Sequence, residues 1–182
     1  RPLTEQHPKL ANHIVDFEQV DKWSELIYGD DLFSALGTTR KQAGGKEGQY
    51  RVDYTYQANV IQAAANNGVK RLFLVSSPWA NADSKFFYTR LKGELEQFAA
   101  KQSFETLVYF KPSLIVGPRQ ENRLGEKIGS GLLEWLCKVI PALRPYRPVQ
   151  GKTLGKAIVN VASGSLNKGV QTISYGEIFS RL

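Results

Sequence analysis

Short apolar runs alternate with helical stretches along the whole chain, and this alternation restricts the possible fold more than any other feature. The run Arg71-Leu72-Phe73-Leu74-Val75 is apolar on both faces, which is typical of a central strand in a parallel sheet. Further strands are expected at 12–16, 106–110 and 170–174, and a buried strand is expected at 31–36. Because alternating strands and helices build βαβ units, the sequence predicts an α/β protein with a parallel sheet.

The helices between these strands are predicted at 18–27, 47–66, 85–100, 131–140, 153–162 and 175–181. In the helix 47–66 one apolar stripe is expected to face the core. It consists of Val52, Tyr56, Val60 and Ala63. Asn67-Gly68 is a typical C-terminal cap and predicts where this helix stops.

Length and composition favour one ordinary domain, 1–182, because a chain of 182 residues buries about 70% of its unfolded surface. Cys137 is the only cysteine, so no internal disulfide is expected. The chain has no signal-like N-terminus and no apolar run near 18 residues, which predicts a cytoplasmic protein without membrane contact. His7 and His13 are too few and too isolated to predict a metal site.

The formal net charge of +7 comes from 24 basic and 17 acidic residues. The basic residues are scattered along the chain and form no single block. This distribution favours a phosphate-bearing ligand and a solvated basic surface over a nucleic-acid-binding face.

Tyr88 and Lys92 are four residues apart in a predicted helix, so they share one face one turn apart. A lysine ammonium beside a phenol is expected to lower the pKa of the tyrosine toward neutral pH. The hydroxyl of Ser77, after the strand 71–75, can then share a substrate oxygen with Tyr88. Taken alone, this pair is more often an amphipathic helix face, and Ser76-Ser77-Pro78 is more often a simple turn.

A glycine-rich turn of the type that holds a dinucleotide pyrophosphate is absent after the first strands. The order of four other motifs nevertheless resembles the atypical short-chain dehydrogenase/reductases of the Tat-interacting-protein and NmrA-like branch. These motifs are Leu36-Gly37-Thr38-Thr39-Arg40, Val75-Ser76-Ser77, Tyr88-x-x-x-Lys92-Gly93-Glu94 and Pro112-Ser113-Leu114-Ile115-Val116-Gly117-Pro118-Arg119-Gln120-Glu121-x-Arg123.

The resemblance implies a Rossmann-type, doubly wound sheet that binds NADP(H). By resemblance Tyr88 is the acid/base, Lys92 holds the nicotinamide ribose, and Ser77, with Ser76 as the alternative, polarises the substrate oxygen. The other cofactor-binding residues that it implies are Arg1, Leu36, Gly37, Thr38, Ile115 and Arg123, with Arg119 as the alternative to Arg123. Arg1 would meet the adenosine 2′-phosphate and favour NADP over NAD.

The chain departs from the family at its start, because members carry roughly thirty further residues, with the glycine-rich turn, before an Arg-Pro-Leu such as Arg1-Pro2-Leu3. The sheet is therefore expected to be N-terminally incomplete. Residues 1–118 are expected to hold the remaining sheet core, and residues 119–182 a smaller helical and strand region on the substrate side.

Two functions are compatible with these features. The first is an NADP(H)-dependent oxidoreductase that transfers hydride to or from a small carbonyl or alcohol whose identity the sequence does not reveal. The alternative is a non-catalytic NADP(H)-binding regulator that acts through a protein partner. The apolar helix predicted at 131–140 would pack either on the sheet or on a second copy in a homodimer.

Overall fold

A four-stranded parallel sheet forms the centre of the computed structural model, which describes residues 3, 5–117 and 146–182. Its strands lie in the order β1-β2-β3-β6. They are β1 (Asp31–Ser34), β2 (Arg71–Val75), β3 (Thr106–Lys111) and β6 (Gly169–Ser174). All neighbouring pairs are parallel, so the carboxyl ends of the four strands meet at one edge. In β2 the middle residues are fully buried, as predicted for a central strand.

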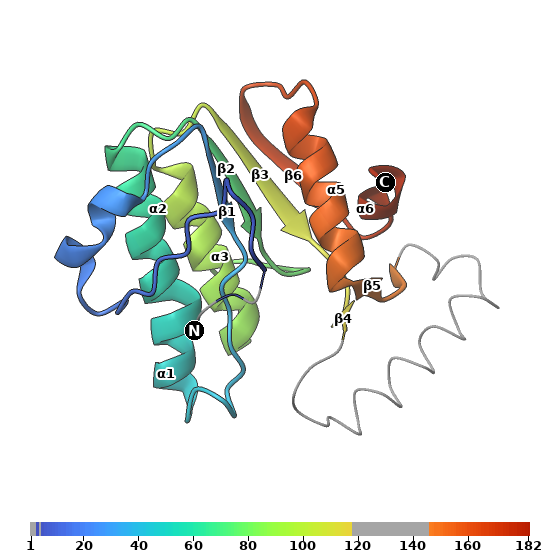
Figure 1. Cartoon of the computed structure of the whole chain (residues 1–182). Coiled ribbons are helices and arrows are strands. Elements are labelled where there is room, and N and C mark those ends of the chain that lie inside the picture. Colours follow the sequence, from blue (N-terminus) through green and yellow to red (C-terminus); the bar gives the residue numbers. More distant parts are fainter. Residues whose placement is uncertain (1–2, 4, 118–145) are drawn as a thin grey trace.

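Helices cover both faces of this sheet, which confirms the predicted doubly wound α/β architecture (Figure 1). One long helical segment consists of α1 (Lys46–Tyr50), a π-helical stretch (Arg51–Tyr56) and α2 (Gln57–Asn66). It packs beside α3 (Phe87–Ala100) on one face, and α5 (Gly151–Ser163) covers the other. The short helix α6 (Gly176–Ser180) follows β6. Gly68, with a φ of 79°, ends α2 as predicted.

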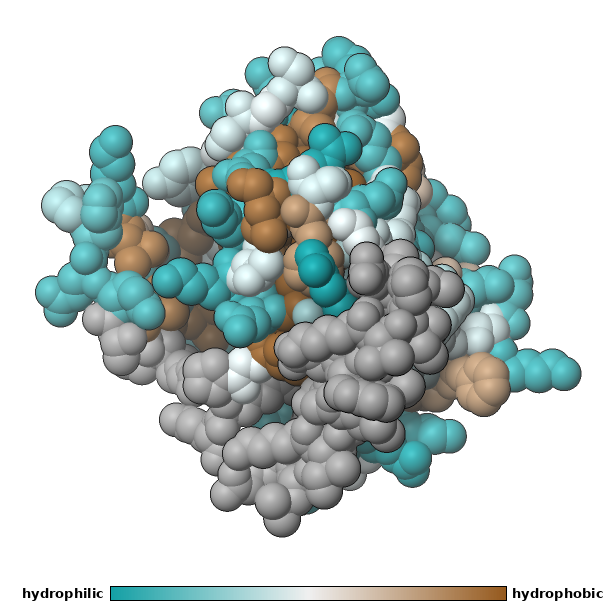
Figure 2. All heavy atoms as spheres, turned by 90° about the vertical axis from the view of Figure 1, so that its right-hand side faces the viewer, coloured by the Kyte–Doolittle hydropathy of each residue, from teal (hydrophilic) through white to brown (hydrophobic). Residues whose placement is uncertain are grey.

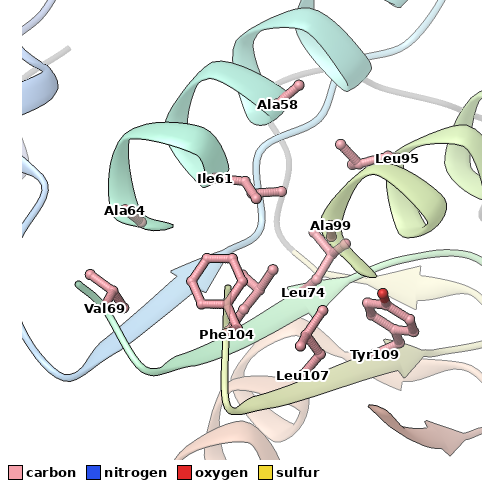
Figure 3. Close-up of a cluster of buried hydrophobic side chains, with 11 residues drawn as sticks. Ala58, Ile61, Ala64, Val69, Leu74, Leu95, Ala99, Phe104, Leu107 and Tyr109 are labelled. Carbon is pink, nitrogen blue, oxygen red and sulfur yellow. The ribbon is translucent and has the colours of Figure 1, made fainter. Parts of the chain in front are cut away.

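The first hydrophobic cluster lies between the sheet and the pair α2 and α3. Figure 3 shows side chains from both helices and from β2 and β3 converging on this space. Ile61 and Ala64 of α2 and Leu95 of α3 are almost fully buried against Leu74 and Leu107. Because successive strand residues point to opposite faces, the residues between these strand positions build a second cluster on the other side.

That second cluster lies between the sheet and α5. Phe73, Val108 and Phe110 pack there against Leu154 and Ala157. The edge strand β1 is covered less completely on this side. Phe33 stacks on Phe73 at a centroid distance of 4.9 Å, but it remains 50% exposed. The strand at 31–36 was expected to be buried throughout. The part that forms, Asp31–Ser34, is only partly buried because no strand among the described residues pairs with its outer edge.

Three other expectations differ from the structure. Residues 12–16 form no strand, since none of the described strands lies beside them to share hydrogen bonds. The helix expected at 18–27 consists of two short 3-10 turns, Val20–Lys22 and Ser24–Leu26. In the long helical segment the most buried stripe contains Asp53 and Gln57, whereas Val52, Tyr56 and Val60 are only partly buried. An apolar pattern could not reveal a buried stripe that carries polar side chains.

The C-terminal part of the chain joins the main sheet. The helix predicted at 153–162 corresponds to α5, and the strand predicted at 170–174 corresponds to β6, which pairs with β3 along its whole length. The main sheet therefore extends beyond the core predicted for residues 1–118. A second, two-stranded parallel sheet of β4 (Ile115–Val116) and β5 (Val149–Gln150) was not predicted. The helix predicted at 131–140 lies outside the described residues.

The surface on the side of the molecule that Figure 2 shows is mixed in character. Hydrophobic side chains there form small groups among hydrophilic ones in the coloured part of the chain. Among the described residues, no helix combines the length and the apolar character that a membrane crossing needs.

Candidate functional site

The carboxyl edge of the sheet brings together three of the predicted segments. Ser76 and Ser77 follow β2 directly, the loop Leu36–Thr38 follows β1, and α3 begins at Phe87, one residue before Tyr88. A parallel sheet opens toward ligands at this edge. The turn after β2 is closed by a hydrogen bond of 3.3 Å from the Ala80 N–H to the Ser77 carbonyl.

The two serines have different partners. The Ser76 hydroxyl donates a hydrogen bond to Glu96, whose other carboxylate oxygen lies 2.9 Å from Lys111 Nζ. The Ser76 hydroxyl therefore joins the end of β2 to α3 and already has a partner in Glu96. The Ser77 hydroxyl lies 3.2 Å from the Pro78 carbonyl and also interacts with the Tyr88 phenol. Ser77, and not the alternative Ser76, is the serine beside Tyr88.

Tyr88 and Lys92 share one face of α3, as their spacing predicts. Lys92 Nζ lies 6.0 Å from the centroid of the Tyr88 ring, and the tyrosine remains 43% exposed. The lysine side chain, by contrast, is only 5% exposed. The ring therefore faces the open carboxyl edge of the sheet, while the ammonium points into the protein.

Asp53 is the buried partner of this ammonium, and sequence reasoning missed it. Its Oδ1 lies 3.6 Å from Lys92 Nζ, and its side chain is only 1% exposed. Its Oδ2 has no hydrogen-bond partner in the described part of the chain. The only sequence signal for Asp53 is a charged residue next to the apolar positions of a predicted helix.

The position of Asp53 connects the long helical segment to the loop after β1. It lies in the π-helical stretch, a helix irregularity that is frequent at functional sites. Its Oδ1 accepts a hydrogen bond of 3.1 Å from the Thr38 N–H. A Cβ at Gly37 would lie 2.9 Å from the same oxygen, so the loop approaches the carboxylate as closely as it does because Gly37 has no side chain. Gln57 extends the network, since it donates to the Asp53 carbonyl and accepts from the Ser34 hydroxyl.

The electrostatics of Tyr88 differ from the sequence expectation. Burial and the nearby Asp53 carboxylate raise the pKa of Tyr88, although the interaction with Ser77 lowers it somewhat. The expected lowering by Lys92 is wrong for this structure, because Lys92 pairs with Asp53 and does not stand as a free cation beside the phenol. Burial lowers the pKa of Lys92, and the carboxylates of Asp53 and Glu96 oppose this effect.

The other predicted site residues are more widely spread. Leu36, Gly37 and Thr38 lie in the loop beside Asp53. Ile115 lies in β4 and packs against the cluster on the α5 side of the sheet. Arg1, Arg119 and Arg123 lie outside the described residues. The described residues hold no group of three metal-ligating side chains.

Comparison with curated proteins gives the family. The chain is 35% identical over 176 residues to the mitochondrial protein FMP52 of Candida albicans, covering 91% of this chain and 76% of that protein. It is 39% identical over 136 residues to the Emericella nidulans protein fmp52, with 75% and 58% covered. The chain belongs to the Fmp52 family.

A third relative of this Fmp52-family chain is HTATIP2 of Rattus norvegicus, 37% identical over 123 residues, which cover 67% of this chain and 50% of that protein. These relatives confirm the predicted resemblance to the Tat-interacting, NmrA-like branch of the atypical short-chain dehydrogenase/reductases. No protein-family model matches the chain. The chain spans between half and three quarters of the length of these three relatives.

Solved structures confirm the Rossmann-type fold of this Fmp52-family chain. MoeE5 in complex with UDP-glucuronic acid and NAD aligns with a TM-score of 0.65 and 16% identity, covering 97% of this chain and 66% of that one. A UDP-galactose 4-epimerase aligns with a TM-score of 0.63 and 14% identity, covering 89% and 60%. At such low identity these structures establish the fold alone.

The expected cytoplasmic location is wrong. The Fmp52 proteins of Emericella nidulans, Aspergillus niger, Candida albicans and Saccharomyces cerevisiae are all named as mitochondrial. The expectation rested on the lack of a signal-like or long apolar segment, and neither feature reports on import into an organelle.

Proposed function

We propose that the protein is an NADP(H)-dependent oxidoreductase that transfers hydride to or from a small carbonyl or alcohol substrate. The observation that carries this proposal is the meeting of Ser77 and Tyr88 at the carboxyl edge of the sheet, with Lys92 one helical turn behind the tyrosine. A hydroxyl and a phenol at one edge, with a buried ammonium behind the phenol, match the needs of proton transfer to a substrate oxygen.

The residues present fit the nicotinamide half of such a cofactor. Lys92 offers a buried ammonium, and its partner Asp53 retains one buried oxygen without a hydrogen-bond partner among the described residues. A ribose hydroxyl is a suitable donor to such an oxygen. The loop Leu36–Thr38 would place backbone groups beside the same ribose. Arg1 remains our proposed contact to the adenosine 2′-phosphate, and Arg123 remains a proposed contact to the cofactor. The bound nicotinamide would supply the hydride.

In this mechanism the protein residues handle the proton and the substrate oxygen. The raised pKa of Tyr88 keeps its phenol protonated at neutral pH, so Tyr88 donates a proton to the developing alkoxide of a carbonyl substrate. The Ser77 hydroxyl donates a hydrogen bond to the same oxygen and orients it. The protonated phenol is the form of Tyr88 that the reduction of a carbonyl requires.

The comparisons support the proposal in a general way. By their titles, MoeE5 binds NAD and the RMD protein of Pseudomonas aeruginosa is complexed with NADPH. The choice of NADP(H) for this chain follows from the family resemblance and from Arg1. The names of the relatives also support a mitochondrial location for this protein.

The test is NADPH oxidation with a panel of small carbonyl compounds, together with NADPH binding by calorimetry. Tyr88→Phe should abolish turnover and leave the Kd for NADPH nearly unchanged, whereas Lys92→Ala should impair both. Tyr28→Phe is the matched control, because Tyr28 is 80% exposed and is remote in sequence from the site. Full turnover in Tyr88→Phe would disprove the assignment. NADPH binding without any Tyr88-dependent turnover would instead favour the regulatory alternative.

A further inference from the structure

Three aromatic side chains from separate segments meet at the carboxyl edge of the sheet. Trp79 follows β2, Tyr175 lies between β6 and α6, and Tyr146 precedes β5. The ring centroids of Trp79 and Tyr175 are 6.4 Å apart, and those of Tyr175 and Tyr146 are 4.7 Å apart with an interplanar angle of 63°. We call these three residues the aromatic cluster.

Two residues of the aromatic cluster have a backbone conformation that residues other than glycine rarely adopt. Trp79 has a φ of 56° and Tyr175 a φ of 43°, and they are the only non-glycine residues with positive φ in the described part of the chain. Trp79 is the third residue of the turn that the Ala80 N–H closes onto the Ser77 carbonyl, where positive φ normally requires glycine. Bulky residues in this region are strained, and such strain concentrates at functional sites.

Trp79 gains no compensating burial in return for this strain, because it is 75% exposed. The other two rings are fixed more firmly. The Tyr175 N–H donates a hydrogen bond of 3.2 Å to the Lys111 carbonyl at the end of β3. Next to Tyr146, the Arg147 carbonyl accepts a hydrogen bond of 2.6 Å from Ser113, and the Arg147 guanidinium lies 3.7 Å from the centroid of the Phe179 ring. The cluster thus combines a supported pair of tyrosines with an exposed indole.

The cluster also adjoins the candidate catalytic residues. Only Pro78 lies between Ser77 and Trp79, and two residue steps along the chain span at most about 7 Å. A ligand whose oxygen contacts Ser77 therefore has its remaining atoms within reach of the indole. Flat rings stack on such a surface, whereas saturated rings of the same size have no π-face to offer.

We propose that the aromatic cluster binds the ring of a planar aromatic carbonyl compound and so sets the substrate class of the enzyme. This inference rests on the proposed function for the placement of the carbonyl oxygen at Ser77 and Tyr88. The stacking itself involves Trp79, Tyr146 and Tyr175 only, and its test does not depend on hydride transfer.

The experiment is calorimetry on the protein without added cofactor, with 2-acetonaphthone and its fully saturated decalin counterpart as probes. We expect the flat ketone to bind about tenfold more tightly than the saturated one. Trp79→Gly, which suits the positive φ and removes the ring, should erase this preference, and Trp79→Phe should retain most of it. Tyr146→Leu provides a second variant outside the strained turn and should weaken binding of the flat ketone.

Equal affinity for the two ketones, failure of the flat ketone to bind, or undiminished binding in Trp79→Gly would overturn the proposal. Tyr88→Phe separates this proposal from the proposed reaction, since it should lose carbonyl reduction and still bind the flat ketone more tightly than the saturated one. If the stacking preference is present but no carbonyl is reduced, the proposed reaction fails and the binding site stands. If flat and saturated ketones are reduced equally well, the binding site fails and the reaction stands.

Discussion

Asp53 and Lys92 form an almost fully buried ion pair, with side chains that are 1% and 5% exposed. Removing one partner of such a pair leaves an uncompensated buried charge, which typically costs about 3–5 kcal/mol. We therefore expect Asp53→Asn to lower the free energy of unfolding by an amount in this range, measured by urea denaturation. Glu94→Gln is the control, because Glu94 pairs with Arg90 at 3.7 Å on the surface and should change stability by less than about 0.5 kcal/mol.

The titration of Tyr88 is a second expectation at this scale. Because its pKa is raised, the difference in phenolate absorbance between the parent protein and Tyr88→Phe should develop above pH 10. Because the pKa of Tyr88 is higher in the folded than in the unfolded protein, the protonated phenol stabilises the folded state below about pH 10. This contribution is lost as the pH rises through the pKa of Tyr88 in the folded protein. In Asp53→Asn the titration should move to lower pH, since the Asp53 carboxylate raises the pKa. An unchanged titration would contradict that cause.

The sequence predicted part of this residue-level picture. The spacing of Tyr88 and Lys92 and the strand end at Ser77 were visible because local periodicity decides them. Asp53 was not, since its partner is 39 positions away and only the packing of two helices brings them together. The direction of the pKa shift of Tyr88 was wrong for the same reason, because that direction depends on what else is buried around the cation.

At the scale of elements, Gly93 lets α3 pass close to the loop after β2. A Cβ at this position would lie 2.2 Å from the backbone of Asn81 and Ala82. Gly93→Ala should therefore displace the helix that carries Tyr88, cost about 1–3 kcal/mol of stability, and reduce turnover. Thermal unfolding and NADPH oxidation are the two measurements.

Gly155 provides the matched control for this substitution. It lies within α5, and no heavy atom that could meet its added Cβ lies within 4 Å. Gly155→Ala should stabilise the protein by up to about 1 kcal/mol, because alanine favours helix more than glycine does. Equal effects of the two substitutions would show that the approach of α3 to the loop is not as tight as described.

Most elements were predictable because each carries a local signal. The apolar strand Arg71–Val75, the helix α3 and the cap at Gly68 lie where periodicity and turn residues predict them. The strand at 12–16 did not form because a short strand-like segment becomes a strand only with a neighbour to pair with. The pair of two-residue strands β4 and β5 is too short to leave any periodic trace in the sequence.

At the scale of the whole molecule, β2 and β3 contribute side chains to both hydrophobic clusters. Leu74 is fully buried on the side of α2 and α3, and Phe110 is fully buried on the side of α5. We expect Leu74→Ala and Phe110→Ala each to lower stability by about 2–5 kcal/mol and to leave one cooperative transition in calorimetry. Val170→Ala, at a residue that is 56% exposed, is the control and should have little effect. Two separate transitions would contradict the prediction of a single domain over residues 1–182.

The pairing of β3 with β6 determines when the sheet can be completed. β3 ends at Lys111, whereas β6 begins only at Gly169, so a long stretch of chain must emerge and fold back before these strands can meet. Contacts between such distant segments form slowly. During synthesis the edge of β3 that later pairs with β6 therefore remains unpaired for some time. Over the same period Phe110 is not yet covered by α5. The newly made chain should depend most on protection from aggregation during this interval.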